Sequence, residues 1–448
     1  MQDKPLGLTR VLARFVVETD TGDIPANIFE YAKIALMDWI SVTLAGKDDP
    51  LVAKLIRYSD LMGGHEQATI LGHGMKKSAS HAALINGAAS HALDYDDTLE
   101  IFVGHPSATL FPSILALSEW KQMSGNDLLT AYIIGIQVGA TIGACGGAEH
   151  YTSGWHATST LGHFASAAGC AKLMGLDEQQ TVYALGIAGT QASGLRSAFG
   201  TMCKPFHAGM SSQAGLVAAL LAGEGFTSAE DILEGRDGFL QVLNGKLNKD
   251  AASALGKKWE TENIIQKYHA SCHATHSPIE GALSVVKEEG LNPGDIKSIK
   301  ILASQMALDV AAKTNIKTGL EGKFSISYCV ANALLRGNTG MQAFTDEKAN
   351  DPDVQEYMKK ISVVCFPDFK MVEAKIEVET NSGQVYTRMV NIMKDVPTIE
   401  TRKAKIKNKL IDLCSPILGD KKSEELSEAI ISLEKIANMR TFVNQISS

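Results

Sequence analysis

The chain has 448 residues, of which 45% are hydrophobic, and its formal net charge is -8 at pH 7. This size and apolar content are typical of a large globular protein with two domains. Because a mildly acidic chain argues against nucleic acid as the main partner, an acidic substrate would need cations concentrated at one site.

The chain up to about residue 260 shows one helical pattern after another. The first clear example, at 23–46, starts at Asp23 and Pro25, continues with apolar residues at helical spacing and ends at Gly46. Further helical patterns, rich in glycine and alanine, occur at 78–97, 163–176, 181–195 and 213–225. Because small side chains let helices approach closely, these segments predict a helix-rich core.

One segment of this half, at 128–148, carries no charged residue and is long enough to be a candidate membrane span. It contains Gln137 and a row of glycines at 135, 139 and 143, which form a smooth stripe for another helix. These glycines do not form the G-x-G-x-x-G loop of dinucleotide-binding proteins. Since no second segment of this kind occurs, we interpret it as a buried core helix and expect no membrane association.

The pattern changes after about residue 260. Residues 297–304 resemble a strand, and residues 372–392 form two alternating runs around Asn381-Ser382-Gly383, which predicts a hairpin. Helical patterns lie between them, at 278–290 and 325–337, and return after about residue 399. These elements predict a mainly α fold: a large all-helical domain, residues 1–260 plus 396–448, with a smaller inserted α+β domain, residues 261–395.

Three further features bear on the surface and the compartment. The basic run at 401–410 is interpreted as the solvated face of a helix. The seven cysteines are scattered, odd in number and without a C-x-x-C motif, which indicates reduced thiols. The start, MQDKPLGLTRVLARF, lacks the apolar core of a signal peptide. We therefore expect a cytoplasmic location.

All twelve histidines lie between residues 65 and 276, which concentrates the candidate chemistry in four stretches. They are HALDYDDTLEIFVGHPS (91–107), SGWHATSTLGH (153–163), AFGTMCKPFHAG (198–209) and KYHASCHATHS (267–277). Loops that enter helices can present backbone N–H groups to anions. Lysines and histidines on such loops would suit a substrate rich in carboxylates.

The first stretch places three aspartates between His91 and His105, namely Asp94, Asp96 and Asp97. It could be a metal site, a solvated surface or the acid–base part of an active site. Asp96 and Asp97 could equally cap a helix or solvate a loop. His91 lies in a helical pattern of small residues and is more simply interpreted as a packed histidine.

The fourth stretch offers an alternative metal site. His269, His273 and His276 are spaced i, i+4 and i+7, so they would share one face of a helix, with Cys272 adjacent. The stretch contains no H-E-x-x-H motif, and the spacing alone specifies a metal site only loosely. We therefore predict no bound metal.

Together the four stretches and FSISYCVA (324–331) resemble, in order and spacing, the MmgE/PrpD family. This family includes 2-methylcitrate dehydratase, cis-aconitate decarboxylase and iminodisuccinate epimerase, and the resemblance spans nearly the whole chain. It implies a helical domain with a smaller α+β lid domain, a homodimer, a small carboxylate substrate and no metal or organic cofactor.

The resemblance also implies the active-site residues. Those expected to be catalytic are Asp94, His105, Lys204, Lys267 and Tyr328, and those expected to bind substrate are Thr98 and His156. His207 and His276 lie in the third and fourth stretches, and we add them as substrate-binding candidates. Tyr328 is equally consistent with a core tyrosine whose hydroxyl is hydrogen-bonded.

Two departures from the family pattern leave the substrate open. The gap between Thr98 and His105 is one residue longer than in the decarboxylases, and Ser271-Cys272-His273 replaces a frequent Cys-Cys pair.

Dehydration, decarboxylation and epimerisation all form a carbanion next to a carboxylate, and fixed cations and donors must stabilise that charge. We expect Lys204 and Lys267 to do so, with His156 and Tyr328 as hydrogen-bond donors. Histidine, whose ordinary pKa lies near neutrality, suits proton transfer at carbon, and this role falls to His105. Asp94 would orient a cation. The alternatives are an epimerase of an imino- or amino-dicarboxylate, a metal-dependent hydrolase and a non-catalytic binding protein.

Overall fold

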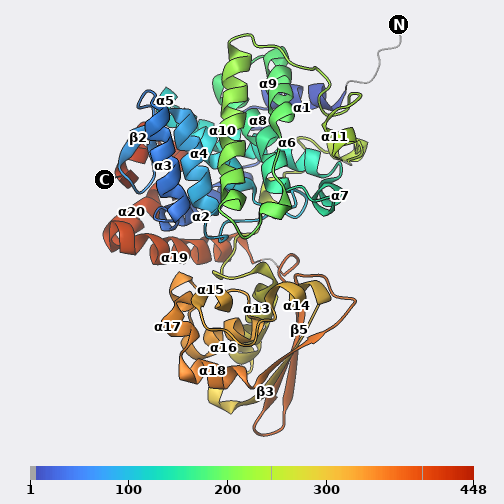
Figure 1. Cartoon of the computed structure of the whole chain (residues 1–448), viewed down its shortest axis with the longest axis vertical. Helices are drawn as coiled ribbons and strands as arrows, with labels where there is room; N and C mark the ends of the chain where they lie inside the picture. The colour runs from blue at the N-terminus through green and yellow to red at the C-terminus, as the bar shows by residue number, and fades with distance from the viewer. Residues whose placement is uncertain (1–6, 244, 396, 448) are drawn as a thin grey trace. The chain divides into compact units, whose positions relative to one another are not determined.

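The computed structural model describes residues 7–243, 245–395 and 397–447 (Figure 1). The chain forms two compact units. The first contains the chain up to Gln266 together with Ile406 onward, and the second is Lys267–Lys405. Helices dominate, and the sheets are small, which confirms the predicted mainly α fold class.

Helices make up most of the first unit. Its N-terminal part contains α1 (Leu8–Glu18), α2 (Ala26–Ala45), α3 (Pro50–Met62), α4 (Ala79–His91), α5 (Pro106–Lys121), α6 (Gly125–Gly143), α7 (Gly147–Thr152), α8 (Ala157–Met174), α9 (Glu178–Gln191), α10 (Cys203–Gly223), α11 (Phe239–Val242) and α12 (Lys249–Ser253). Its C-terminal part contains the end of α19 (Ile399–Leu418), α20 (Asp420–Ile431) and α21 (Met439–Ser447). The expected all-helical domain also contains a short antiparallel pair, β1 (Ala68–Ile70) and β2 (Met75–Lys77).

Local signals in the sequence set the ends of these helices. Helix α2 follows Pro25 and ends at Gly46, as the pattern predicts. The side chain of Ser78 accepts a hydrogen bond from the backbone N–H of His81 and so caps the start of α4. Helix α5 begins with Pro106, whose missing N–H costs nothing at the first helical position.

Glycines let the central helices approach closely. Helix α10 packs against α4 and α8, and α4 and α10 run side by side in Figure 1. A Cβ added to Gly87 of α4 would lie 2.8 Å from the Cα of Gly209 in α10. His91 lies one turn after Gly87, and His207 lies two residues before Gly209. The contact between the two glycines therefore brings the end of α4 beside the start of α10.

Helix α6 is the uncharged segment identified in the sequence. All its residues from Leu128 to Gly143 are buried. Its glycine stripe is a packing surface, since a Cβ on Gly135 would lie 2.8 Å from the carbonyl oxygen of Ala165 in α8. The prediction of a core helix is therefore confirmed. Across the part of the chain that the structure describes, none of the helices has the length and apolar character needed to cross a membrane.

The second unit contains helices and a four-stranded sheet. The helices are α13 (His276–Glu288), α14 (Gln305–Ala311), α15 (Gly319–Gly322), α16 (Ile326–Arg336), α17 (Asp346–Ala349) and α18 (Pro352–Met358). The strands are β3 (Ile296–Ala303), β4 (Ile361–Cys365), β5 (Glu373–Thr380) and β6 (Val385–Asn391).

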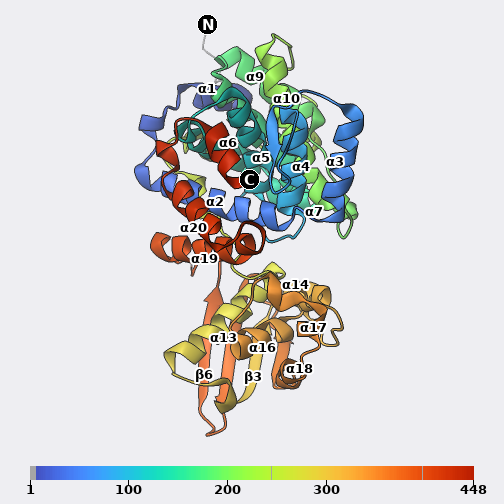
Figure 2. The ribbon, with the colours of Figure 1, turned by 90° about the vertical axis from the view of Figure 1, so that its left-hand side faces the viewer.

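The sheet has the strand order β4-β3-β5-β6. Strands β3 and β4 are parallel, while β3 pairs antiparallel with β5 and β5 with β6. Residues of β5 alternate between buried and half-buried, because one face lies against helices. Helix α13 packs on β5 and β6, and Figure 2 shows it over that face of the sheet. The predicted strand at 297–304 and the predicted hairpin at 372–392 are both confirmed.

The interpretation of the basic run at 401–410 is wrong for two of its residues. Arg402 and Lys409 of α19 are 5% and 6% exposed. Lys409 is buried because its ammonium forms an ion pair with the carboxylate of Asp38 in α2, at 2.6 Å. Buried lysine is rare unless it is paired in this way.

Candidate active site

The segment between α4 and α5 carries the aspartates of the first sequence stretch. Backbone hydrogen bonds close it into a compact loop: the N–H of Leu99 donates to the carbonyl of Gly104, and that of Val103 to the carbonyl of Glu100, both at 2.9 Å. Two residues have left-handed backbone conformations, Asp94 with φ 51° and Val103 with φ 50°. Such conformations are costly for a β-branched residue and are concentrated at functional sites.

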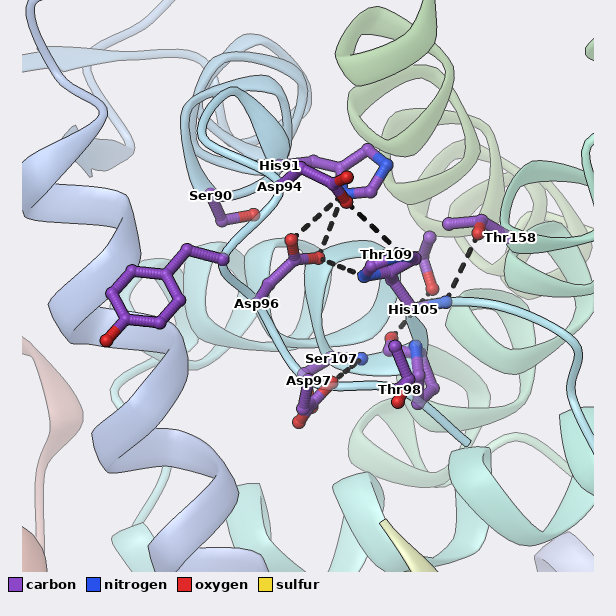
Figure 3. A network of polar contacts seen from close by, with 12 residues as sticks. Ser90, His91, Asp94, Asp96, Asp97, Thr98, His105, Ser107, Thr109 and Thr158 are labelled. Carbon is purple, nitrogen blue, oxygen red and sulfur yellow. Dashed lines mark hydrogen bonds and ion pairs between the residues drawn. The ribbon is translucent and has the colours of Figure 1, made fainter. Parts of the chain in front are cut away.

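Asp96 is fully buried between two histidines (Figure 3). Its Oδ2 lies 2.9 Å from Nδ1 of His91 and 3.1 Å from Nδ1 of His105. Burial alone would raise the pKa of Asp96, but His105 and His91 outweigh it and hold the pKa well below its ordinary range. Asp96 is therefore a buried carboxylate anion stabilised by two imidazole rings.

The hydrogen bond with Asp96 defines the proton position on the His91 ring. A carboxylate only accepts hydrogen bonds, so Nδ1 of His91, which faces it, carries the proton. Burial lowers the pKa of His91 to about 4, so this ring is neutral at pH 7. In a neutral ring with a proton on Nδ1, Nε2 keeps a lone pair. His105 is 13% exposed, and its two ring nitrogens face different carboxylates, Nδ1 that of Asp96 and Nε2 that of Asp94.

Asp94 has a different environment from Asp96. Its side chain is 47% exposed, and its Oδ1 lies 3.0 Å from Nζ of Lys204 and 3.5 Å from Nε2 of His105. Burial would lower the pKa of Lys204, but the charge of Asp94 outweighs that effect and raises it. The first unit thus brings together three candidates expected from the sequence: Asp94, His105 and Lys204.

The remaining candidates of the first unit are His156, His207 and Thr98. Nδ1 of His156 lies 3.2 Å from Nδ1 of His207, and the ring of His156 stacks on that of His91 with centroids 5.9 Å apart. Burial lowers the pKa of both His156 and His207, so both rings are neutral at pH 7, and one Nδ1–H donates to the lone pair of the other Nδ1. Thr98 exchanges backbone hydrogen bonds of 2.8 Å with Ile265, which fixes the end of the loop.

The second unit contains Lys267, His276 and Tyr328. Lys267 and His276 are each 3% exposed, and Tyr328 is fully buried. The hydroxyl of Tyr328 donates a 2.5 Å hydrogen bond to the carbonyl of Ala343, and burial raises its pKa. In this conformation Tyr328 therefore has the environment of a hydrogen-bonded core tyrosine.

The three histidines of the fourth stretch converge, but not on one helix face. Residues 273–275 form a 3-10 turn, and α13 starts only at His276. The ring of His276 lies 4.9 Å from that of His269 and 5.0 Å from that of His273. The expected shared helix face is wrong because the chain turns before the helix begins.

A glutamate that sequence reasoning missed joins this group. Glu280 Oε1 lies 3.3 Å from Nε2 of His269 and 2.8 Å from Nζ of Lys405. Burial would raise the pKa of Glu280, but His269 and Lys405 outweigh it and lower the pKa to about 2. Glu280 lies one turn after His276 in a helical pattern, and this spacing was the only signal in the sequence that could have identified it.

Two interpretations of the first stretch need correction. His91 is a packed histidine, as expected, but it also contacts the carboxylate at the centre of the cluster. Asp96 neither caps a helix nor solvates a loop; its buried carboxylate faces the two histidines, and Lys204 pairs with Asp94. Asp97 does have a structural role, since it accepts a 2.5 Å hydrogen bond from the hydroxyl of Ser107 in α5.

The same cluster contains a possible set of metal ligands. One ligand atom from each of His91, Asp94, Asp96 and His105 lies within 4.8 Å of the others. Imidazole nitrogen and carboxylate oxygen are ligands for zinc and related ions. The ammonium of Lys204 beside Asp94 would oppose a bound cation, so the donor set allows a metal but its charge environment disfavours one.

Two domain models of one protein family match most of the chain. The MmgE/PrpD N-terminal domain matches residues 10–251, and the MmgE/PrpD C-terminal domain matches residues 269–435. The chain belongs to the MmgE/PrpD family.

The chain is also similar to several curated enzymes. It is 26% identical to cis-aconitate decarboxylase-like protein oryM of Aspergillus oryzae, over 98% of this chain and 97% of that protein. It is 26% identical to cis-aconitate decarboxylase of Aspergillus terreus, over 97% and 94% of the two chains. A mitochondrial 2-methylcitrate dehydratase of Yarrowia lipolytica is 26% identical over 80% of this chain and 74% of that enzyme.

Proposed function

We propose that the protein is a cofactor-independent lyase that acts on a small tricarboxylate by way of a carbanion next to a carboxylate. The observation that carries the proposal is the cluster of His105, Asp96, Asp94 and Lys204. The named activities of its relatives, cis-aconitate decarboxylase and 2-methylcitrate dehydratase, support the choice of reaction and substrate class.

His105 is the group that we assign to proton transfer at carbon. Its ring is oriented by Asp96 on Nδ1, and its backbone N–H donates a 3.2 Å hydrogen bond to the hydroxyl of Thr158. In dehydration, Nε2 would remove the proton from the carbon next to the carboxylate. In decarboxylation, the protonated ring would deliver a proton to the carbon from which CO2 has left. A positioned acid or base of this kind is typically worth about 10²–10⁴-fold in rate.

Lys204 is the cation that we assign to the substrate carboxylate on which negative charge develops. Its present partner, Asp94, is a half-exposed carboxylate. A substrate carboxylate has the same charge and geometry, so it could take the place of Asp94 on the ammonium. Fixed charges in a partly desolvated site stabilise a developing anion more strongly than they would in water.

Lys267, His276 and Tyr328 remain predicted site residues, as do Thr98, His156 and His207. A homodimer and a cytoplasmic location also remain predictions. Light scattering of the purified protein tests the first, and fractionation of the source cells tests the second.

An NMR screen in D2O tests the reaction class. The purified protein is incubated with cis-aconitate, citrate, 2-methylcitrate and iminodisuccinate. Loss of water or CO2 from a tricarboxylate is the expected result. Deuterium exchange into recovered iminodisuccinate without such loss would instead identify an epimerase, and binding without turnover would identify a non-catalytic protein.

Removal of metal tests the cofactor independence. Protein treated with a chelator should keep its full turnover, and elemental analysis should find no stoichiometric metal. Stoichiometric zinc or iron, with activity lost on chelation and restored by the ion, would contradict the proposal and favour metal-dependent chemistry at the same ligands.

A further inference from the structure

Lys409, in the C-terminal part of the chain, contacts the loop between α4 and α5 that carries Asp94 and Asp96. Its Nζ donates a 2.7 Å hydrogen bond to the backbone carbonyl of Tyr95, 314 residues away in sequence. The same ammonium forms a 2.6 Å ion pair with Asp38 and lies 3.6 Å from the centre of the Tyr95 ring. The side chains of Lys409 and Asp38 are 4% and 1% exposed. A buried, charge-assisted group of contacts of this kind has one defined geometry.

The carbonyl that Lys409 binds lies between the two carboxylates of the candidate site. Tyr95 lies between Asp94, which contacts Lys204, and Asp96, which contacts His91 and His105. Its carbonyl belongs to the peptide group that leads into Asp96. Because that peptide group is planar, rotation of the carbonyl would turn the backbone of Asp96 with it.

The rest of the loop is held by contacts further along the chain. Asp97 is bound by Ser107, and Thr98 pairs with Ile265. On the other side, Asp94 has a left-handed backbone conformation that local sterics do not favour. Lys409 therefore anchors the loop at the point between the two carboxylates of the cluster.

We propose that Lys409 is a positioning residue that sets the direction of Asp94 and Asp96, and through Asp96 the orientation of the His105 ring. Asp38 keeps the ammonium at the Tyr95 carbonyl and balances its charge. The kinetic part of this inference rests on the proposed function; the structural part does not.

The test compares two buried lysines. Lys409→Met removes the hydrogen bond and the ion pair, and Lys409→Met with Asp38→Asn also removes the buried charge of Asp38. The control is Lys33→Met: Lys33 is a buried lysine of α2 that donates to the carbonyl of Ile431 and pairs with Glu434 and Glu30, which are partly exposed, so it combines a backbone contact with ion pairs away from the loop. Removing one partner of a buried pair is strongly destabilising, which is why the double variant is included.

We expect the double variant to regain thermal stability and still lose about 10–100-fold in kcat, with KM within about threefold, because a misplacement of about 1 Å can cost about 10²-fold. Lys33→Met should lower the melting temperature and leave kcat within about twofold. The proposal is overturned if the double variant recovers kcat to the wild-type value, or if Lys33→Met loses as much kcat as Lys409→Met.

A second readout does not depend on any substrate. Long-range ¹H–¹⁵N spectra of the histidine rings report the protonated nitrogen of His91 and His105. The double variant should lose the Nδ1–H signals that Asp96 maintains, and Lys33→Met should keep them. Unchanged signals in the double variant would overturn the positioning role, even if the wild-type protein turns over none of the four tricarboxylate and dicarboxylate substrates.

Discussion

Each unit contains a cluster of histidine, carboxylate and lysine. The clusters differ in whether the histidine and the lysine contact the same carboxylate or also separate ones. In the first unit, His105 contacts both Asp96 and Asp94, and Lys204 contacts only Asp94 among them. In the second unit, one carboxylate, that of Glu280, contacts both His269 and Lys405.

This difference affects what each cluster can do when a substrate carboxylate arrives. In the first, Asp94 could leave Lys204 while the buried Asp96 keeps the His105 ring oriented. In the second, a carboxylate that displaced Glu280 from Lys405 would also release His269. Separate orienting and exchangeable carboxylates therefore suit proton transfer, whereas a shared carboxylate suits the fixing of charge.

Backbone conformation also differs between the two clusters. Among the described residues, the loop from His91 to His105 contains two of the non-glycine residues with positive φ, and the segment from Lys267 to Glu280 contains none. Strain of this kind persists only where surrounding contacts over-determine the conformation. The left-handed residues therefore indicate that surrounding contacts constrain the loop from His91 to His105 more than the segment from Lys267 to Glu280.

The largest expected effect belongs to the histidine of the first cluster. His105→Ala should lower kcat/KM by about 10²–10⁴-fold, the usual worth of a positioned acid–base group. Steady-state kinetics on the substrate identified by NMR measures it. The control is His65→Ala, since His65 is exposed. Activity of His105→Ala within a few-fold of the control would remove the basis for comparing the clusters.

Asp96→Asn should have the next largest effect, about 10²-fold in kcat, because loss of the carboxylate that orients a catalytic histidine can cost up to about 10⁴-fold. It should also reduce stability at neutral pH. The pKa of Asp96 is depressed in the folded protein, so its stabilisation is present above the ordinary aspartate range and is lost as the pH falls. Asp94→Asn should change stability less, since Asp94 is half exposed. Equal losses of unfolding free energy in Asp94→Asn and Asp96→Asn would contradict the view that Asp96 is the fixed carboxylate and Asp94 the exchangeable one.

Glu280 gives a test of the second cluster through pH. Its folded pKa is about 2 against an ordinary value of 4.5, so the unfolded chain takes up the proton first as the pH falls. The stabilisation is therefore complete above about pH 5 and lost progressively towards pH 2. Glu280→Gln should lower the melting temperature by about 2–4 °C at pH 7.

Thermal unfolding at pH 7, 5, 4 and 3 follows this difference. The melting curves of wild type and Glu280→Gln should converge as the pH falls. A difference that stays constant down to pH 3 would show that Glu280 does not carry a depressed pKa, and would weaken the view of it as a shared, fixed carboxylate.

The smallest effect concerns the strained loop. Val103→Gly should leave the free energy of unfolding within about 1 kcal/mol of wild type, because relief of about 1–2 kcal/mol of left-handed strain offsets the greater chain entropy of glycine. Val385→Gly in strand β6 is the matched control. It adds the same chain entropy of glycine to the unfolded state but relieves no left-handed strain, so it should be destabilised by about 0.5–1 kcal/mol. Urea unfolding measures both; a larger loss at Val103 than at Val385 would argue against strain in the loop.

Much of the fold could be predicted from local patterns. The helical pattern at 23–46 became α2, and the alternating runs at 372–392 became β5 and β6. Periodicity and cap residues act over a few positions, so they are readable along the chain. The spacing of His269, His273 and His276 misled because it assumed a helix that begins only at His276.

Three of the residues predicted for the site lie together in the first unit, but the sequence did not predict their pairings. Asp94, His105 and Lys204 were expected, while the roles of Asp96, Glu280 and Lys409 were missed. Nothing near Lys409 distinguishes it from the exposed lysines of the same basic run, since its burial depends on Asp38 and Tyr95. Likewise, Asp94 and Asp96 are two residues apart, and only their surroundings separate an exchangeable carboxylate from a buried one.

The sequence by itself determined the helical and strand segments, the family and the stretches that carry the reactive side chains, because these depend on residue types and short spacings. Only the tertiary structure decided which carboxylate is buried, which nitrogen of His105 faces it and which lysine supports the loop. Those properties depend on desolvation and on charges brought from 110 residues away, as for Lys204 and Asp94, or from 314, as for Lys409 and Tyr95.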